Sequence, residues 1–133
     1  QLKRLKRFIS KRKKISKIYD NFFVDNKKFQ IPNKIKGNSN SFHLYPLLIN
    51  FKQINLSKEK VLKNFLKNKI KLQVHYVPVN IQPYYKKKYG LKIRNFKNSF
   101  EFFNKVVSLP IYYELKNKEK NYFKKVCKKI LKI

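Results

Sequence analysis

Apolar side chains recur with a helical period in the first part of the chain. The period is set by Leu2, Leu5, Phe8, Ile9, Ile15, Ile18, Tyr19, Phe22 and Phe23, while lysines and arginines fill the other face. The pattern predicts one long amphipathic helix over residues 1–23. Such a helix usually packs its apolar face on a core, and a basic one can instead lie on an anionic membrane surface. We expect the core-facing arrangement.

The next part of the chain has the pattern of strands joined by loops. Residues 25–40 hold Pro32, Gly37 and a Gly-Asn-Ser-Asn-Ser run, which is typical of a loop. Residues 42–51 predict a strand. Residues 72–79 predict a second strand, with Gln73, His75, Val77 and Val79 on one face and Leu72, Val74, Tyr76 and Pro78 on the other. Pro78 indicates that this strand ends there or lies at an edge.

Further helices fill the rest of the chain. Ser57 predicts a cap for a helix that ends at Leu66. Residues 81–89 predict a short helix or turn closed by Gly90. Ser99 is the predicted cap of a helix that covers Phe102, Phe103, Val106 and Val107 and ends at 108–110. Asn117 is the predicted cap of a last helix, whose inward side chains are Tyr122, Phe123, Val126, Ile130 and Leu131. With a short extra strand near Ile111, the order predicts an α+β fold: a small antiparallel or mixed sheet with helices packed on one side.

The charge of the chain is strongly positive. Its formal net charge is +29, which suggests nucleic acid or another polyanion as a partner. Lysine supplies 31 of the 35 basic residues, however, and arginine is the residue suited to bidentate contacts with phosphate and guanine. The chain also has 15 Asn, 13 Ile and no Ala, a composition that A/T-rich codons explain as a whole. A lysine-rich nucleic-acid-associated module without enzyme activity remains the alternative function.

The residues that carry catalysis or bind metals do not form a complete set. The six acids are scattered, the two glycines make no phosphate cradle, and His43 and His75 lack a neighbouring acid. Cys127, the one cysteine, cannot form an intramolecular disulfide, and its helical context predicts a buried, inert thiol. We therefore expect no metal site and no self-sufficient catalyst.

The start of the chain is unusual for an open reading frame. It begins with Gln1 and contains no Met. No apolar run approaches the roughly 20 residues of a transmembrane helix, and no signal peptide is visible. We expect a fragment of a longer protein, in the cytoplasm and without membrane or specific nucleic-acid partners.

Two polar-aromatic clusters remain as candidates for ligand binding. One is Ser41-Phe42-His43-Leu44-Tyr45-Pro46. The other is Gln73-Val74-His75-Tyr76-Val77-Pro78-Val79, followed by Gln82-Pro83-Tyr84-Tyr85. Imidazole and phenol groups can hydrogen-bond sugar hydroxyls or phosphate oxygens while their rings stack. From the residues alone, ordinary core aromatics with satisfied polar tips are the favoured interpretation of the clusters.

These clusters carry a resemblance to a known family. Five segments, in one order over the whole chain, resemble the C-terminal part of the DegT/DnrJ/EryC1/StrS sugar-nucleotide aminotransferases. They are the opening helix, the Ser-Phe-His-Leu-Tyr-Pro strand, the Val-His-Tyr-x-Pro segment, the Gln-Pro-Tyr-Tyr run with Gly90, and Ser-Leu-Pro-Ile-Tyr at 108–112. The form of the second cluster looks most similar to the members that make UDP-4-amino-4,6-dideoxy-N-acetyl-β-L-altrosamine in pseudaminic acid synthesis.

The resemblance implies a fold, a reaction and a set of contacts. It implies the small C-terminal domain of a fold-type I aminotransferase, with residues 1–24 as the linking helix and 25–133 as the domain. The enzyme would be a homodimer that moves an amino group from glutamate to a 4-keto UDP-sugar. Pyridoxal 5'-phosphate and the catalytic residues would belong to a missing N-terminal domain, so the fragment alone is expected to be inactive. Substrate contacts carried over from the family are His75, Tyr76, Val77 and Pro78, with His43 and Tyr45 as further candidates.

Overall fold

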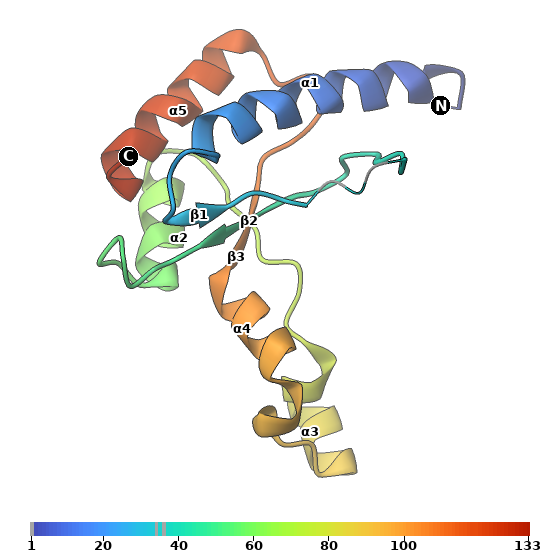
Figure 1. Cartoon of the computed structure of the whole chain (residues 1–133), viewed down its shortest axis with the longest axis vertical. Helices are drawn as coiled ribbons and strands as arrows, with labels where there is room; N and C mark the ends of the chain where they lie inside the picture. The colour runs from blue at the N-terminus through green and yellow to red at the C-terminus, as the bar shows by residue number, and fades with distance from the viewer. Residues whose placement is uncertain (1, 34, 36) are drawn as a thin grey trace.

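A three-stranded antiparallel sheet lies at the centre of the molecule (Figure 1). The computed structural model describes residues 2–33, 35 and 37–133. The strand order is β1-β2-β3, and β2 therefore pairs on both sides. Alternate side chains of β2, those of Tyr45, Leu47 and Ile49, are buried, as expected for a strand with one face on the core. The strands are β1 (Phe29–Gln30), β2 (Tyr45–Ile49) and β3 (Val106–Leu109).

Three helices cover the sheet. α1 and α5 lie side by side above it, with α2 beside them (Figure 1). The rings of Tyr19 in α1 and Phe123 in α5 are 5.2 Å apart, and that of Phe65 in α2 is 6.1 Å from Phe123. One apolar core thus joins all three helices to the sheet. The bounds are α1 (Leu5–Phe23), α2 (Lys58–Lys67) and α5 (Asn117–Leu131).

The predicted first helix is confirmed. A 3-10 turn, η1 (Leu2–Arg4), leads into α1. The buried residues of α1, among them Ile15, Tyr19 and Phe23, lie in its second half. In its first half, the half-buried ring of Phe8 lies 4.3 Å from that of Tyr113, whereas Leu2 in η1 is 85% exposed. Gln1 lies outside the described residues. Across the part of the chain that the structure describes, no helix combines the length and apolar character needed to cross a membrane.

The caps of two helices differ in how well they were predicted. Ser57 caps α2 as expected, because its hydroxyl accepts a hydrogen bond from the Lys60 amide at 3.1 Å. For α5 the predicted cap at Asn117 is wrong by one residue. The backbone amide of Lys116 donates to Glu119 Oε2 at 2.7 Å, so Glu119 closes the first turn of this helix. Cys127 in α5 is buried, as predicted.

The last strand replaces the end of a predicted helix. The helix α4 (Lys97–Lys105) begins before Ser99, so Ser99 is not its cap, and it stops before Val106. Val106 and Val107 belong to β3, where they pair with Leu48 and Leu47. All four residues of β3 are buried. The extra strand that was expected near Ile111 thus lies a few residues earlier. The strand β1 likewise falls in a segment predicted as loop.

The predicted strand over residues 72–79 is reduced to a single bridge. Gln73 pairs with Ser108: the Gln73 amide donates to the Ser108 carbonyl at 3.1 Å, and the Ser108 amide donates to the Gln73 carbonyl at 2.7 Å. Beyond Gln73, an antiparallel ladder could use only Val107 and Val106 of β3 before it reached the helical Lys105. The chain leaves the sheet before it uses these two partners.

Residues 79–105 form an arm that extends away from the core (Figure 1). The short helix α3 in the arm ends at Gly90, which adopts the left-handed conformation (φ 59°) as its predicted role requires. α4 contacts β2 and joins the arm to the sheet. The elements of the arm are η2 (Val79–Ile81), α3 (Pro83–Tyr89), η3 (Ile93–Phe96) and α4, and none of them has a buried residue.

Candidate functional site

The two histidines line one pocket at the edge of the sheet. His43 lies at a bend just before β2, and His75 follows the bridge between Gln73 and Ser108. Because β2 and β3 are neighbours, both segments reach the same edge. The pocket has a volume of about 230 Å³ and is lined by His43, Leu44, Lys71, Gln73, His75 and residues 108–112.

The ring of His75 is held in place from inside the pocket. Its Nδ1 lies 2.9 Å from the hydroxyl oxygen of Ser108, a buried residue of β3. The ring of Tyr76 meets it edge to face, with centroids 4.9 Å apart. Because Ser108 occupies Nδ1, Nε2 is the ring nitrogen that a ligand can use. A fixed imidazole that faces a pocket suits the hydrogen bonding of hydroxyl or phosphate oxygens.

The three residues after His75 do not line this pocket and form a largely exposed segment next to it. Tyr76 is 76% exposed and Val77 is 48% exposed. Pro78 is half-buried and precedes η2, and the side chain of Gln82 donates to the Val77 carbonyl at 3.2 Å. An exposed phenol and valine next to a fixed imidazole offer both stacking and apolar contact to a ligand.

Tyr45 has a different environment from the other candidates. Its side chain is 1% exposed, and its hydroxyl donates to Asp20 Oδ1 at 2.9 Å. Burial, with the Asp20 carboxyl group next, raises the pKa of Tyr45 above its ordinary value. Its ring packs against Tyr19 at 5.1 Å between centroids. The hydroxyl of Tyr45 thus points into the core, and we assign this side chain a structural role.

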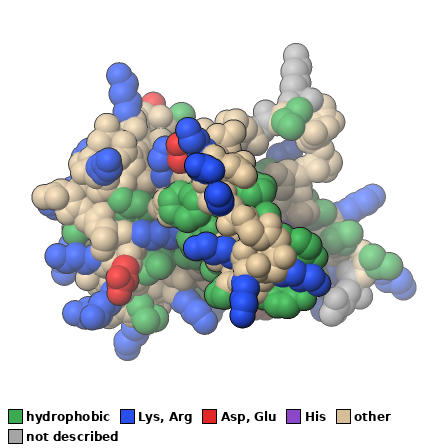
Figure 2. Space-filling view, turned by 90° about the horizontal axis from the view of Figure 1, so that it is seen from below, with side chains coloured by type: hydrophobic (Ala, Val, Ile, Leu, Met, Phe, Trp, Pro, Cys, Tyr) green, Lys and Arg blue, Asp and Glu red, His purple; other side chains and the backbone are tan. Residues whose placement is uncertain are grey.

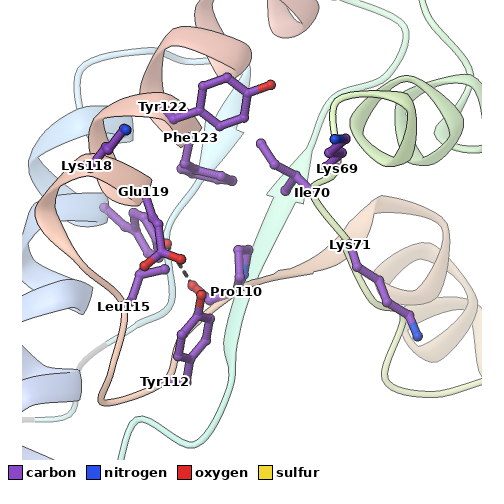
Figure 3. Close-up of a pocket in the computed structure, with 11 residues that line it drawn as sticks. Lys69, Ile70, Lys71, Pro110, Tyr112, Leu115, Lys118, Glu119, Tyr122 and Phe123 are labelled. Carbon is purple, nitrogen blue, oxygen red and sulfur yellow. Dashed lines mark hydrogen bonds between the residues drawn. The ribbon is translucent and has the colours of Figure 1, made fainter.

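A larger pocket lies beside the histidine pocket, and sequence reasoning missed it. It has a volume of about 550 Å³ between α5 and the segment that follows α2 (Figure 3). Tyr112 hydrogen-bonds Glu119 across its mouth, and burial together with Glu119 raises the pKa of Tyr112. Its lysines could not be told from the lysine-rich background of the sequence. The lining residues are Tyr19, Lys69, Ile70, Lys71, Pro110, Tyr112, Leu115, Lys118, Glu119, Tyr122 and Phe123.

Lys58, the lysine whose pKa is lowered by burial, does not face a site for pyridoxal phosphate. A Schiff base needs an activated amine that faces an open pocket. Burial lowers the pKa of Lys58, but its amine donates to the Phe103 carbonyl and lies 4.5 Å from the centre of the Phe103 ring. Lys58 does not line either pocket described above. Within the described ranges, no three side chains of His, Cys, Asp or Glu gather as metal ligands.

Comparison with known proteins gives the family. The model of the DegT/DnrJ/EryC1/StrS aminotransferase family matches residues 1–131. A UDP-4-amino-4,6-dideoxy-N-acetyl-beta-L-altrosamine transaminase from Campylobacter jejuni is 35% identical; the match covers 98% of this chain and 34% of that protein. The spore coat polysaccharide biosynthesis protein SpsC of Bacillus subtilis is 31% identical over 84% of this chain and 29% of its own length. The chain therefore spans about a third of the length of these relatives.

Solved structures agree with this assignment. Helicobacter pylori PseC, an aminotransferase involved in the biosynthesis of pseudoaminic acid, superposes with a TM-score of 0.88 at 26% identity, over 99% of this chain and 35% of PseC. The pyridoxal-phosphate form of the putative sugar aminotransferase Spr1654 from Streptococcus pneumoniae gives 0.85 at 25% identity, over 99% of this chain and 33% of that one. An enzyme part is therefore favoured over a nucleic-acid module. The chain belongs to the DegT/DnrJ/EryC1/StrS aminotransferase family.

Proposed function

We propose that this chain is the small C-terminal domain of an aminotransferase that moves an amino group from glutamate to a 4-keto UDP-sugar, and that the histidine pocket contacts the sugar nucleotide. The observation that carries the proposal is the meeting of His43 and His75 in one pocket, with His75 fixed by Ser108. The likeness to a UDP-sugar transaminase over 98% of the chain supports the substrate class.

The size of the pocket indicates which part of the substrate it holds. Ligand sites commonly measure about 300–1,000 Å³, so a pocket of about 230 Å³ is too small for a whole UDP-sugar. It suits the sugar ring or one phosphate group. In this arrangement His75 Nε2 hydrogen-bonds a sugar hydroxyl or a phosphate oxygen, and Tyr76, Val77 and Pro78 contact the part of the substrate that extends beyond the pocket. His43 borders the same pocket.

The remaining parts of the reaction belong to the polypeptide outside this chain. Pyridoxal phosphate supplies the electron sink for amino transfer in this family. Because Lys58 faces neither pocket, and because the chain spans about a third of its relatives' length, we propose that the cofactor and the catalytic residues belong to a preceding domain, connected by residues 1–24. In the proposed enzyme this chain binds and orients the sugar nucleotide. We further propose that the enzyme is a cytoplasmic homodimer and that the isolated chain is inactive.

The proposal is tested on the full-length protein that carries this chain. Purified protein is incubated with pyridoxal phosphate, glutamate and a 4-keto UDP-sugar, and the amino sugar is detected by mass spectrometry. Removal of one hydrogen bond to the substrate corresponds to about 1.4 kcal/mol, so His75→Ala should raise the KM for the sugar nucleotide roughly tenfold. The absorbance of the bound cofactor should stay unchanged.

Two further variants separate positioning from general damage. Ser108→Ala removes the hydrogen bond that orients His75, and it should raise the same KM by less. Leu66→Ala, on the exposed side of α2, is the matched control and should leave the KM at the wild-type value. Absence of amino transfer by the wild-type protein would refute the function. Wild-type kinetics of His75→Ala would refute the site.

A further inference from the structure

The arm of residues 79–105 carries more exposed apolar surface than a solvated segment needs. Seven of its large apolar side chains are exposed, with Tyr84 at 62% and Tyr89 at 58%. Figure 2 shows hydrophobic side chains between lysines on the face of the molecule that includes the end of the arm. We call these seven residues the arm surface: Val79, Tyr84, Tyr85, Tyr89, Ile93, Phe96 and Phe102.

The arm has little of its own to hold it in place. Its elements are short, the longest being α4 with 9 residues, and none of them buries a side chain. Isolated helices of this length are marginal in water, and most of their stability comes from tertiary packing. The rings of Tyr85 and Tyr89 stack at 6.3 Å, and their other ring contacts, with Tyr84 and Lys88, also come from α3 itself. The arm therefore lacks the surface on which it would pack.

We infer that the arm surface packs on the remaining part of the same polypeptide, the part that the relatives have beyond the third that this chain matches. This inference rests on the proposed function, in which that part holds the cofactor. The arm directly follows residues 75–78, a segment that begins at His75 in the pocket. Packing of the arm would therefore hold this segment next to the domain that supplies the chemistry.

The area of the arm surface favours the same polypeptide over a separate partner. Large aromatic side chains bury about 150–250 Å² each, so the exposed fractions of the seven residues amount to roughly 600 Å². With an equal area from the surface that it contacts, the arm surface would bury about 1,200 Å² in total. That total is the lower limit for a stable complex of separate molecules, about 1,200–2,000 Å². It lies well within the about 600–1,500 Å² of interfaces between domains of one chain, where a tether also makes a smaller contact effective. The arm surface suits such an intramolecular interface.

Lysines in the arm make the contact measurable by proteolysis. Trypsin cleaves after Lys86, Lys87, Lys88, Lys92 and Arg94, which are all exposed here. Cleavage follows local opening, so docking of the arm should slow it. We expect cleavage within the arm to be about tenfold slower in the full-length protein than in the 133-residue chain. Cleavage after Lys63 and Lys67 in α2, outside the arm, serves as the internal reference.

Variants of the arm surface complete the test. In the full-length protein, Tyr89→Ser and Phe96→Ser should restore rapid cleavage of the arm, whereas Leu66→Ser, an exposed apolar residue of α2, should not. Equal cleavage of the arm in the two lengths of protein overturns the inference. Protection that is lost on dilution also overturns it, because it assigns the contact to a second subunit. A protected arm without amino transfer supports the inference and refutes the proposed function. Amino transfer with an unprotected arm supports the proposed function and refutes the inference.

Discussion

The hydrogen bond between Tyr45 and Asp20 allows a quantitative test of the core. It joins β2 to α1, and both residues are buried. Tyr45→Phe removes the hydroxyl and keeps the ring, so packing against Tyr19 is retained. A hydrogen bond to a charged group contributes about 1.5–3 kcal/mol, and removal of the donor also leaves Asp20 with one partner fewer. We expect a loss of about 2 kcal/mol in the free energy of unfolding.

This loss is measured by unfolding the 133-residue chain in urea and by heat, with circular dichroism as the signal. For a chain of this size, about 2 kcal/mol lowers Tm by roughly 6–10 °C. Tyr122→Phe is the matched control, because its hydroxyl is exposed and makes a 3.3 Å hydrogen bond to the Asn68 carbonyl. The control should stay within about 0.5 kcal/mol of the wild type. If Tyr45→Phe is as stable as the control, the hydrogen bond does not stabilise the core as described.

Three more predictions concern the core and the arm. Burial raises the pKa of Tyr19 and of Tyr45, so these hydroxyl groups lose their protons at a lower pH in the unfolded chain than in the folded one. The free energy of unfolding should therefore fall as pH rises above about 10, by up to ~1.4 kcal/mol per pH unit for each tyrosine. This dependence on pH should be weaker in the Tyr19→Phe/Tyr45→Phe variant. Burial also raises the pKa of the Cys127 thiol, so an aromatic disulfide reagent should modify it only when urea unfolds the chain; rapid reaction in the native state would contradict its placement in the core. Gly90→Ala forces a side chain into the left-handed region (φ 59°) at the end of α3 and should cost about 1 kcal/mol locally, seen as faster amide exchange in the arm but not in α5.

The helices were predictable because their apolar residues keep one period over several turns. α1, α2 and α5 each bury one stripe against the same core, and Ser57 adds a cap signal. β3 was not predictable in this way. All four of its residues, including Ser108, are buried, and such a short, fully buried run has no alternation that distinguishes a strand from the end of a helix.

The strand predicted over 72–79 failed for a reason outside its own sequence. Its alternation is typical of a strand. The neighbouring strand β3 is only 4 residues long and directly follows the helix α4, so it offers partners for no more than four residues of this segment. Pairing depends on the partner, and no local pattern reports the length of a partner 30 residues away.

The sequence predicts which residue types form the candidate site, but it predicts their positions in the fold only in part. His43 and His75 were singled out, and the structure brings them to one pocket. Tyr45 carries the same kind of signal as Tyr76, yet its hydroxyl is buried on Asp20 because Tyr45 lies on the core face of β2. The face of a strand that a residue occupies depends on the register with β1 and β3, which the sequence alone does not define.

The two histidines of this chain allow the central claim to be tested by NMR. The full-length protein is labelled with ¹⁵N-histidine, and the signals of His43 and His75 are assigned with His43→Gln and His75→Gln. Titration with a UDP-sugar should shift the ring signals of His75 most and those of His43 less, whereas equal concentrations of ATP should leave both unchanged. If the UDP-sugar saturates the enzyme in the turnover assay and the His75 signals stay where they are, the pocket at the edge of this sheet does not hold the sugar nucleotide.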